Sequence, residues 1–306
     1  MTTVAAVDCG TNTIKLMVAD LDRETGRADV RVRESRMVRL GQGVDRTGEL
    51  APEALERTFA AIDEYAALVA QHPVERVRFC ATSAARDARN GEEFAAGVAA
   101  RLGVRPDVVA GTEEARLSFD GAVRNLRASH PEPLLVVDIG GGSTELILGD
   151  LASGVRQAHS MDIGSVRMHE RHLGGDPPTP AQVAAAASDI DAALDACPVD
   201  PSEAATVVGV AGTILTVAAG VLGLDRYDRE RIDQSVLPRD AVHLQAAAYL
   251  GMTVEERLAL PYMHPGRADV IGAGALVLDR VLERTGVGSI VVSEADILDG
   301  IAWSLV

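Results

Sequence analysis

The stretches VDCGTNT (residues 7–13) and VDIGGGST (residues 137–144) decide the fold of this chain. Each begins with the end of an apolar strand and continues through Asp, an apolar residue and glycine to small hydroxyl residues. Each then leads into a second apolar strand, so each predicts a tight hairpin. The two stretches lie about 130 residues apart, which indicates duplication at the scale of a domain and not a short repeat.

The elements around these stretches follow from apolar periodicity. Alternation predicts an antiparallel meander of three strands over residues 3–7, 13–19 and 28–38. Helical spacing then predicts helices at 52–71 and 91–101 and from Thr112, with short strands at 77–80 and 106–109 between them. After 127, a polar segment with two prolines breaks the pattern, and strands at 134–137 and 145–148 repeat the opening.

The break predicts a first domain over residues 1–127 and a second over 128–306. It stays open at this point whether the last helix, which ends near Trp303, returns to the first domain.

The composition excludes several classes of protein. The formal net charge of −16 repels nucleic acid, anionic lipid and polyphosphate alike, so a phosphate ligand needs local donors. The uncharged stretch 204–224 contains four glycines and no aromatic anchors, which argues against a membrane span. Three widely spaced cysteines and the absence of a visible secretory signal favour a cytoplasmic protein.

Two common phosphate-binding motifs are also excluded. Lys15 is the only lysine of the chain and follows Ile14, whereas a Walker P-loop needs lysine after its second glycine. In the second stretch, Glu145 stands where a dinucleotide-binding fingerprint has its last glycine, and the next residues alternate like a strand.

The two hairpins nevertheless suit phosphate chemistry. Small residues let backbone amides approach a phosphate, and the Asp can hold magnesium or water at the same point. A single copy would read more simply as a tight turn. Two copies at matching places favour phosphate binding. A third glycine loop, at residues 210–213, fits either another phosphate contact or a plain strand-to-helix turn.

Taken in order along the chain, these motifs resemble one family. They are AVDCGTNT (6–13), ATSAAR (81–86) followed by Asn90, GTEEAR (111–116), VDIGGGSTE (137–145), GVAGT (209–213) and RADVI (267–271). Together they resemble the exopolyphosphatase and guanosine pentaphosphate phosphohydrolase (Ppx/GppA) family, in its short two-domain form. The family belongs to the actin, Hsp70 and sugar kinase superfamily.

This resemblance implies an α/β fold of two RNase H-like (actin-like ATPase) lobes, with the active site in the cleft between them. It implies an exopolyphosphatase that removes terminal orthophosphate from inorganic polyphosphate, with guanosine pentaphosphate (pppGpp) as a related substrate. It also implies a magnesium-dependent homodimer. Nucleic acid and membrane partners are not expected.

The resemblance assigns roles that spacing alone does not. Glu113 and Glu114 both fall in the first turn of a helix, where carboxylates meet the positive end of its dipole, and the family pattern makes Glu114 the catalytic base. Arg86 matches the arginine beside the terminal phosphate. The expected metal ligands are Asp138 and Glu145, with Asp8 facing them. The expected phosphate contacts are Asn12, Thr13, Gly141, Gly142, Ser143, Gly212, Thr213 and Arg267.

Some features depart from this picture or leave it open. Leu298 stands where many family members have an arginine, which removes an anion contact or ion pair there. Lys15, Arg36 and Arg39 are expected to be solvated charges of the meander.

Two alternative functions stay open. One is a sugar or small-molecule kinase of the same superfamily, and the other is a regulator that binds alarmones without turnover.

Overall fold

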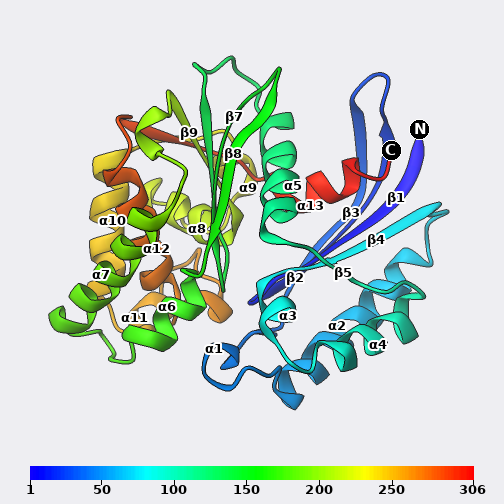
Figure 1. Ribbon diagram of the computed structural model, residues 1–306, viewed down its shortest axis with the longest axis horizontal. Coiled ribbons are helices and arrows are strands. Elements are labelled where there is room, and N and C mark those ends of the chain that lie inside the picture. Colours follow the sequence, from blue (N-terminus) through cyan, green and yellow to red (C-terminus); the bar gives the residue numbers. More distant parts are fainter. The chain divides into compact units, whose positions relative to one another are not determined.

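The computed structural model of the protein describes residues 1–306. The chain forms two compact units, of which the first comprises Met1–Gly121 with Ile297–Val306 and the second comprises Ala122–Asp296. The chain therefore passes between the units twice. Figure 1 shows the last helix, in red, lying beside the strands of the first unit, which come from the opposite end of the chain.

The first unit is built on a five-stranded sheet of order β3-β2-β1-β4-β5. The first three strands are antiparallel, whereas β4 runs parallel to β1 and β5 parallel to β4. The strands are β1 (Thr2–Cys9), β2 (Thr13–Asp22), β3 (Arg27–Met37), β4 (Arg76–Ala81) and β5 (Asp107–Val108). The helices are α1 (Val44–Thr47), α2 (Pro52–Val69), α3 (Ser83–Asp87), α4 (Gly91–Leu102), most of α5 (Gly111–Arg124), and α13 (Ile297–Trp303).

Helices cover both faces of this first sheet. Val7 belongs to a core cluster with Phe94 of α4, and its neighbour Ala6 belongs to another cluster with Leu117 of α5 and Ile301 of α13. Successive side chains of a strand point to opposite faces, so a strand covered on both sides has a continuous apolar sequence. This accounts for the unbroken apolar run that precedes the first hairpin turn.

The second unit repeats the plan in a six-stranded sheet of order β10-β11-β9-β6-β7-β8. In it β6, β7, β8, β9 and β11 take the places of the five strands of the first unit, and β10 is an additional edge strand. The strands are β6 (Leu134–Ile139), β7 (Thr144–Asp150), β8 (Gly154–Met161), β9 (Thr206–Val210), β10 (Val236–Pro238) and β11 (Ser289–Val292). The helices are α6 (Ser165–His172), α7 (Pro180–Ala196), α8 (Ala211–Val221), α9 (Arg229–Ile232), α10 (Arg239–Gly251), α11 (Val254–Leu258) and α12 (Ile271–Glu283).

The duplication is exact enough to include an irregularity of the backbone. The ladder of β2 with β3 shifts its register between Val18 and Ala19. The ladder of β7 with β8 shifts between Leu148 and Gly149, which are the equivalent positions at an offset of 130. These features confirm the predicted α/β fold of two RNase H-like lobes.

Some expectations about single elements need adjustment. The predicted strand at 106–109 shrinks to the two residues of β5, and β8, whose exposed polar residues mask its alternation, is a strand that the periodicity does not predict. The uncharged stretch 204–224 forms β9 and α8. None of the helices is both long and apolar enough to cross a membrane.

Candidate active site

In the first unit, the parallel strands end side by side. The amide of Thr82, just after β4, donates to the carbonyl of Cys9 at the end of β1 with a distance of 3.2 Å. The carboxyl ends of the strands are where open α/β sheets bind ligands. Asp8 lies at the end of β1, Arg86 in the helix that follows β4, and Glu114 in the helix that follows β5. The topology therefore places these three predicted residues on a strand that ends, and on two helices that follow strands that end, at one edge of the sheet.

Glu114 is the buried member of the acidic pair. Its side chain is 8% exposed, and its Oε2 accepts a hydrogen bond of 3.0 Å from Nη1 of Arg86. The same nitrogen of Arg86 donates to the carbonyl of Val109 at 3.0 Å. Glu113, by contrast, is 39% exposed and forms a 2.6 Å ion pair with Arg78. The structure thus separates two glutamates that helical spacing leaves equivalent.

The first glycine turn, at residues 10–13, is closed by hydrogen bonds of its backbone. The amide of Gly10 donates to the carbonyl of Thr13 at 3.0 Å, and the carbonyl of Asn12 accepts from the amide of Val38 at 3.0 Å. The hydroxyl of Thr13 donates to the sulfur of Met37 at 3.2 Å. Asn12 and Thr13 therefore lie in a hydrogen-bonded turn at the sheet edge, and the hydroxyl of Thr13 already donates to Met37.

Lys15 lies directly opposite Asp8 in the ladder of β1 with β2. Its Nζ is 3.3 Å from Oδ2 of Asp8, and the two side chains are only 20% and 7% exposed. The expectation that Lys15 is a solvated charge is therefore wrong. Arg36 does behave as a solvated charge, because it pairs with the exposed side chains of Glu34 and Glu64. Asp8 consequently has a cation of the protein beside it.

The second glycine turn closes in the same way as the first. The amide of Gly140 donates to the carbonyl of Ser143 at 3.0 Å. A Cβ on Gly164 would overlap the backbone of Gly141, so the start of α6 packs closely behind the turn. The amides of Gly141 and Gly142 donate to no other group of the chain. Two adjacent backbone donors in a glycine turn are typical of an anion-binding site.

Asp138 and Glu145 are directly opposite each other in the ladder of β6 with β7. Directly opposite residues of antiparallel strands have their side chains on the same face, so the hairpin itself brings these carboxylates together. The residues are 7% and 2% exposed, and Oε1 of Glu145 accepts a 2.6 Å hydrogen bond from the hydroxyl of Ser160. Two hard oxygen ligands, one of them oriented by a neighbour, fit magnesium.

The third glycine loop lies at the same edge of the second sheet. In the ladder of β6 with β9, Asp138 is opposite Val210, the first residue of the loop. Gly212 and the buried Thr213 then form the first turn of α8. The loop is thus brought to the strand end that holds the predicted metal ligands.

Arg267 packs against this third loop. A Cβ on Gly212 would overlap the guanidinium of Arg267, so only glycine leaves room for it. Nη1 of Arg267 donates to the hydroxyl of Thr216 at 2.8 Å, and burial lowers the pKa of the guanidinium. A partly desolvated arginine beside a glycine loop is a typical partner for phosphate oxygens.

The profile of the Ppx/GppA phosphatase family matches residues 21–306. The chain belongs to the Ppx/GppA family. This confirms the family that the motifs predict, over nearly the whole sequence.

Several members of the Ppx/GppA family are similar to this chain over nearly all of its length. Exopolyphosphatase 2 of Mycobacterium tuberculosis is 46% identical over 320 aligned positions, covering 100% of this chain and 99% of that protein. The guanosine-5'-triphosphate,3'-diphosphate pyrophosphatase of Photobacterium profundum is 30% identical, covering 98% of this chain and 59% of that protein. The crystal structure of an exopolyphosphatase-like protein matches with a TM-score of 0.96 and 44% identity, covering 99% and 97% of the two chains. An Aquifex aeolicus Ppx/GppA family member matches with a TM-score of 0.83 and 30% identity, with the same coverage.

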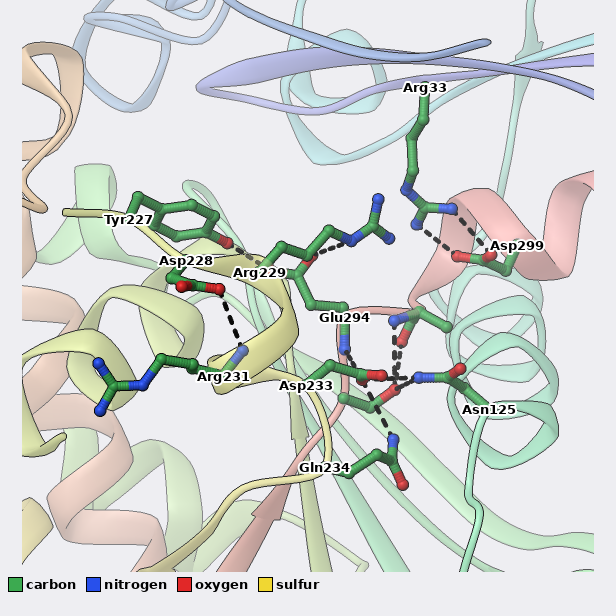
Figure 2. A network of polar contacts seen from close by, with 12 residues as sticks. Arg33, Asn125, Tyr227, Asp228, Arg229, Arg231, Asp233, Gln234, Glu294 and Asp299 are labelled. Carbon is green, nitrogen blue, oxygen red and sulfur yellow. Dashed lines mark hydrogen bonds and ion pairs between the residues drawn. The ribbon is translucent and has the colours of Figure 1, made fainter. Parts of the chain in front are cut away.

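The departure from the Ppx/GppA pattern at Leu298 has a structural reason. The side chain of Leu298 is 1% exposed and lies in the core cluster between β1 and α13. On the same helix, Asp299 accepts two hydrogen bonds from Arg33 of β3, of 2.9 and 2.7 Å, which Figure 2 shows. Position 298 therefore serves the packing of α13 within the first unit.

One polar network of this Ppx/GppA chain is absent from the sequence-based predictions. The hydroxyl of Tyr227 donates to Oε1 of Glu294 at 2.6 Å, and Arg229 lies 3.3 Å from Oε2 of the same carboxylate (Figure 2). Tyr227 and Glu294 also interact electrostatically with Arg267. These residues come from separate segments, so no local pattern groups them. In the sequence, the one feature that points to a functional role for Glu294 is its position just after an apolar strand.

Proposed function

We propose that this chain is an exopolyphosphatase that hydrolyses terminal orthophosphate from inorganic polyphosphate, with guanosine pentaphosphate as a related substrate. The observation that carries the proposal is the ion pair of the buried Glu114 with the partly exposed Arg86 at the carboxyl edge of the first sheet. The 46% identity to Exopolyphosphatase 2 along the full chain supports it. Relatives named as phosphatases favour this activity over the kinase and the regulator without turnover.

In the proposed reaction, Glu114 accepts the proton of a water molecule that attacks the terminal phosphorus in line. Arg86 has two roles in this reaction. It orients the carboxylate of Glu114 through the 3.0 Å hydrogen bond, and its planar guanidinium offers further donors to the terminal phosphate. A buried base is also protected from competing contacts with bulk water.

Magnesium is the proposed cofactor, and Asp138 and Glu145 are its proposed ligands. When bound, the ion would neutralise charge on the phosphoryl oxygens. The amides of Gly141 and Gly142 and the guanidinium of Arg267 are proposed to hold the phosphate chain. The other proposed phosphate contacts are those at the glycine turns, namely Asn12, Thr13, Ser143, Gly212 and Thr213.

We further propose that the protein works in the cytoplasm as a homodimer, without nucleic acid or membrane partners. All three cysteines are free thiols, which suits a reducing compartment. The net charge of −16 disfavours polyanionic surfaces. The homodimer follows from the family resemblance, and sedimentation velocity of the purified protein tests it.

The test of the activity is phosphate release, measured with magnesium against polyphosphates of several lengths, guanosine pentaphosphate and ATP in parallel. We expect release from polyphosphate without any acceptor, and loss of that release when EDTA removes the metal. ATP-dependent phosphorylation of an acceptor, with no release from polyphosphate, would overturn the proposal in favour of a kinase.

A further inference from the structure

The two duplicated hairpins differ at one equivalent position. Both carry a carboxylate near the end of their first strand, Asp8 in β1 and Asp138 in β6, and both turns close with the same 3.0 Å glycine hydrogen bond. The residue directly opposite this carboxylate is Lys15 in the first hairpin and Glu145 in the second. One unit therefore pairs the carboxylate with an ammonium, and the other pairs it with a second carboxylate.

This difference changes what each hairpin attracts. In the first, the ammonium and carboxylate are 3.3 Å apart and little exposed, so the pair of Asp8 and Lys15 is neutral as a whole. In the second, Asp138 and Glu145 carry two negative charges when ionised, at residues that are 7% and 2% exposed. Away from bulk water, two adjacent carboxylates attract a divalent cation far more strongly than a neutral ion pair does.

The choice of lysine at this position is itself informative. Lys15 is the only lysine among 29 basic residues, all the others being arginine. An ammonium is a compact point charge with three donors, whereas a guanidinium is planar and extended. Of the side chains that carry positive charge, lysine comes nearest to a metal ion in shape.

We infer that Lys15 is a built-in cation of the first unit, which takes the place of a divalent ion beside Asp8 and confines metal binding to the hairpin of Asp138 and Glu145. Lys15 is a positioning residue, because it orients Asp8 and provides a fixed charge at the strand end. The inference rests on the proposed function, which supplies the metal and its ligands Asp138 and Glu145. Its central statement, the number of bound ions, does not depend on turnover.

The substitution Lys15→Glu tests this directly, because it gives the first hairpin the carboxylate pair of the second. The probe is Mn²⁺ in place of Mg²⁺, with unbound ion counted by electron paramagnetic resonance and no substrate present. We expect Lys15→Glu to bind one more Mn²⁺ per chain than the wild type. The control is Arg46→Glu, which changes the net charge equally at an exposed residue of the same unit and is expected to bind no additional ion.

Two companion variants sharpen the result. Lys15→Arg keeps the charge and is expected to bind as many ions as the wild type. Glu145→Gln removes one proposed ligand and is expected to weaken Mn²⁺ binding by roughly tenfold or more. If Lys15→Glu is unfolded without metal, circular dichroism during the Mn²⁺ titration reports the same gain, because binding then restores the fold.

The outcomes separate this inference from the proposed function. No additional ion in Lys15→Glu, an equal gain in Arg46→Glu, or a loss of fold that Mn²⁺ does not restore would each overturn the role of Lys15. Suppose that Lys15→Glu binds an additional ion but the wild type releases no phosphate from polyphosphate. The proposed exopolyphosphatase activity would then be refuted, whereas the role of Lys15 as a built-in cation would be supported.

Discussion

The substitution Glu114→Gln removes a negative charge while keeping the shape of the side chain. Oε2 of Glu114 accepts from Nη1 of Arg86 at 3.0 Å, and the amide oxygen of glutamine can accept the same hydrogen bond. The variant therefore keeps the contact but loses the proton acceptor. General bases contribute about 10²–10⁴-fold to rates, so we expect kcat to fall by that factor. This corresponds to a barrier higher by about 3–5 kcal/mol.

The same variant is expected to remain folded and to bind substrate. The hydrogen bond to Arg86 changes from charge-assisted to neutral, and Arg86 is 28% exposed, so water partly compensates for the lost charge. We expect a loss of about 1 kcal/mol in the free energy of unfolding, measured by urea denaturation. Polyphosphate binding, measured by equilibrium dialysis, should stay close to that of the wild type.

The neighbouring Glu113 provides a matched control for this experiment. Glu113→Gln makes the same chemical change one residue earlier, at a partly exposed ion pair with Arg78 that contributes about 1 kcal/mol. Phosphate release by Glu113→Gln should equal that of the wild type. A normal kcat in Glu114→Gln, or an equal loss in both variants, would refute the assignment of Glu114 as the base.

Three further substitutions test other contacts. Gly212→Ala places a Cβ in the guanidinium of Arg267, and we expect steady-state kinetics to show a KM for polyphosphate raised by roughly tenfold with an unchanged Tm. Gly300→Ala places a Cβ in the backbone of Leu117 inside the first unit, and urea denaturation should show a loss of about 1–3 kcal/mol. A hydrogen bond to a neighbouring carboxylate raises the pKa of His243 above its ordinary 6.5, so the stability from this contact is complete below pH 6.5 and is lost as the pH rises through the raised pKa. His243→Gln should remove that part of the dependence of Tm on pH.

Local patterns predicted most of the elements and failed where tertiary pairing decides. The hairpin strands and the helix from Pro52 follow from short-range periodicity and turn chemistry. By contrast, β5 consists of only two residues, which the apolar pattern cannot delimit. The pairing of β8 depends on β7 beside it, because its own sequence is largely polar.

The sequence by itself determined the fold class, the duplicated hairpins and the family, because these depend on patterns that extend over a few residues and recur along the chain. Only the tertiary structure separated Glu114 from Glu113, since the two differ in which distant arginine each one meets. The tertiary structure also placed Lys15 beside Asp8. In the sequence, Asp8 and Lys15 are seven residues apart, as are Asp138 and Glu145, and the spacing alone does not show that each pair lies side by side in its hairpin. Spacing within one segment places a residue on a face, whereas partners from other segments decide its charge environment and therefore its role.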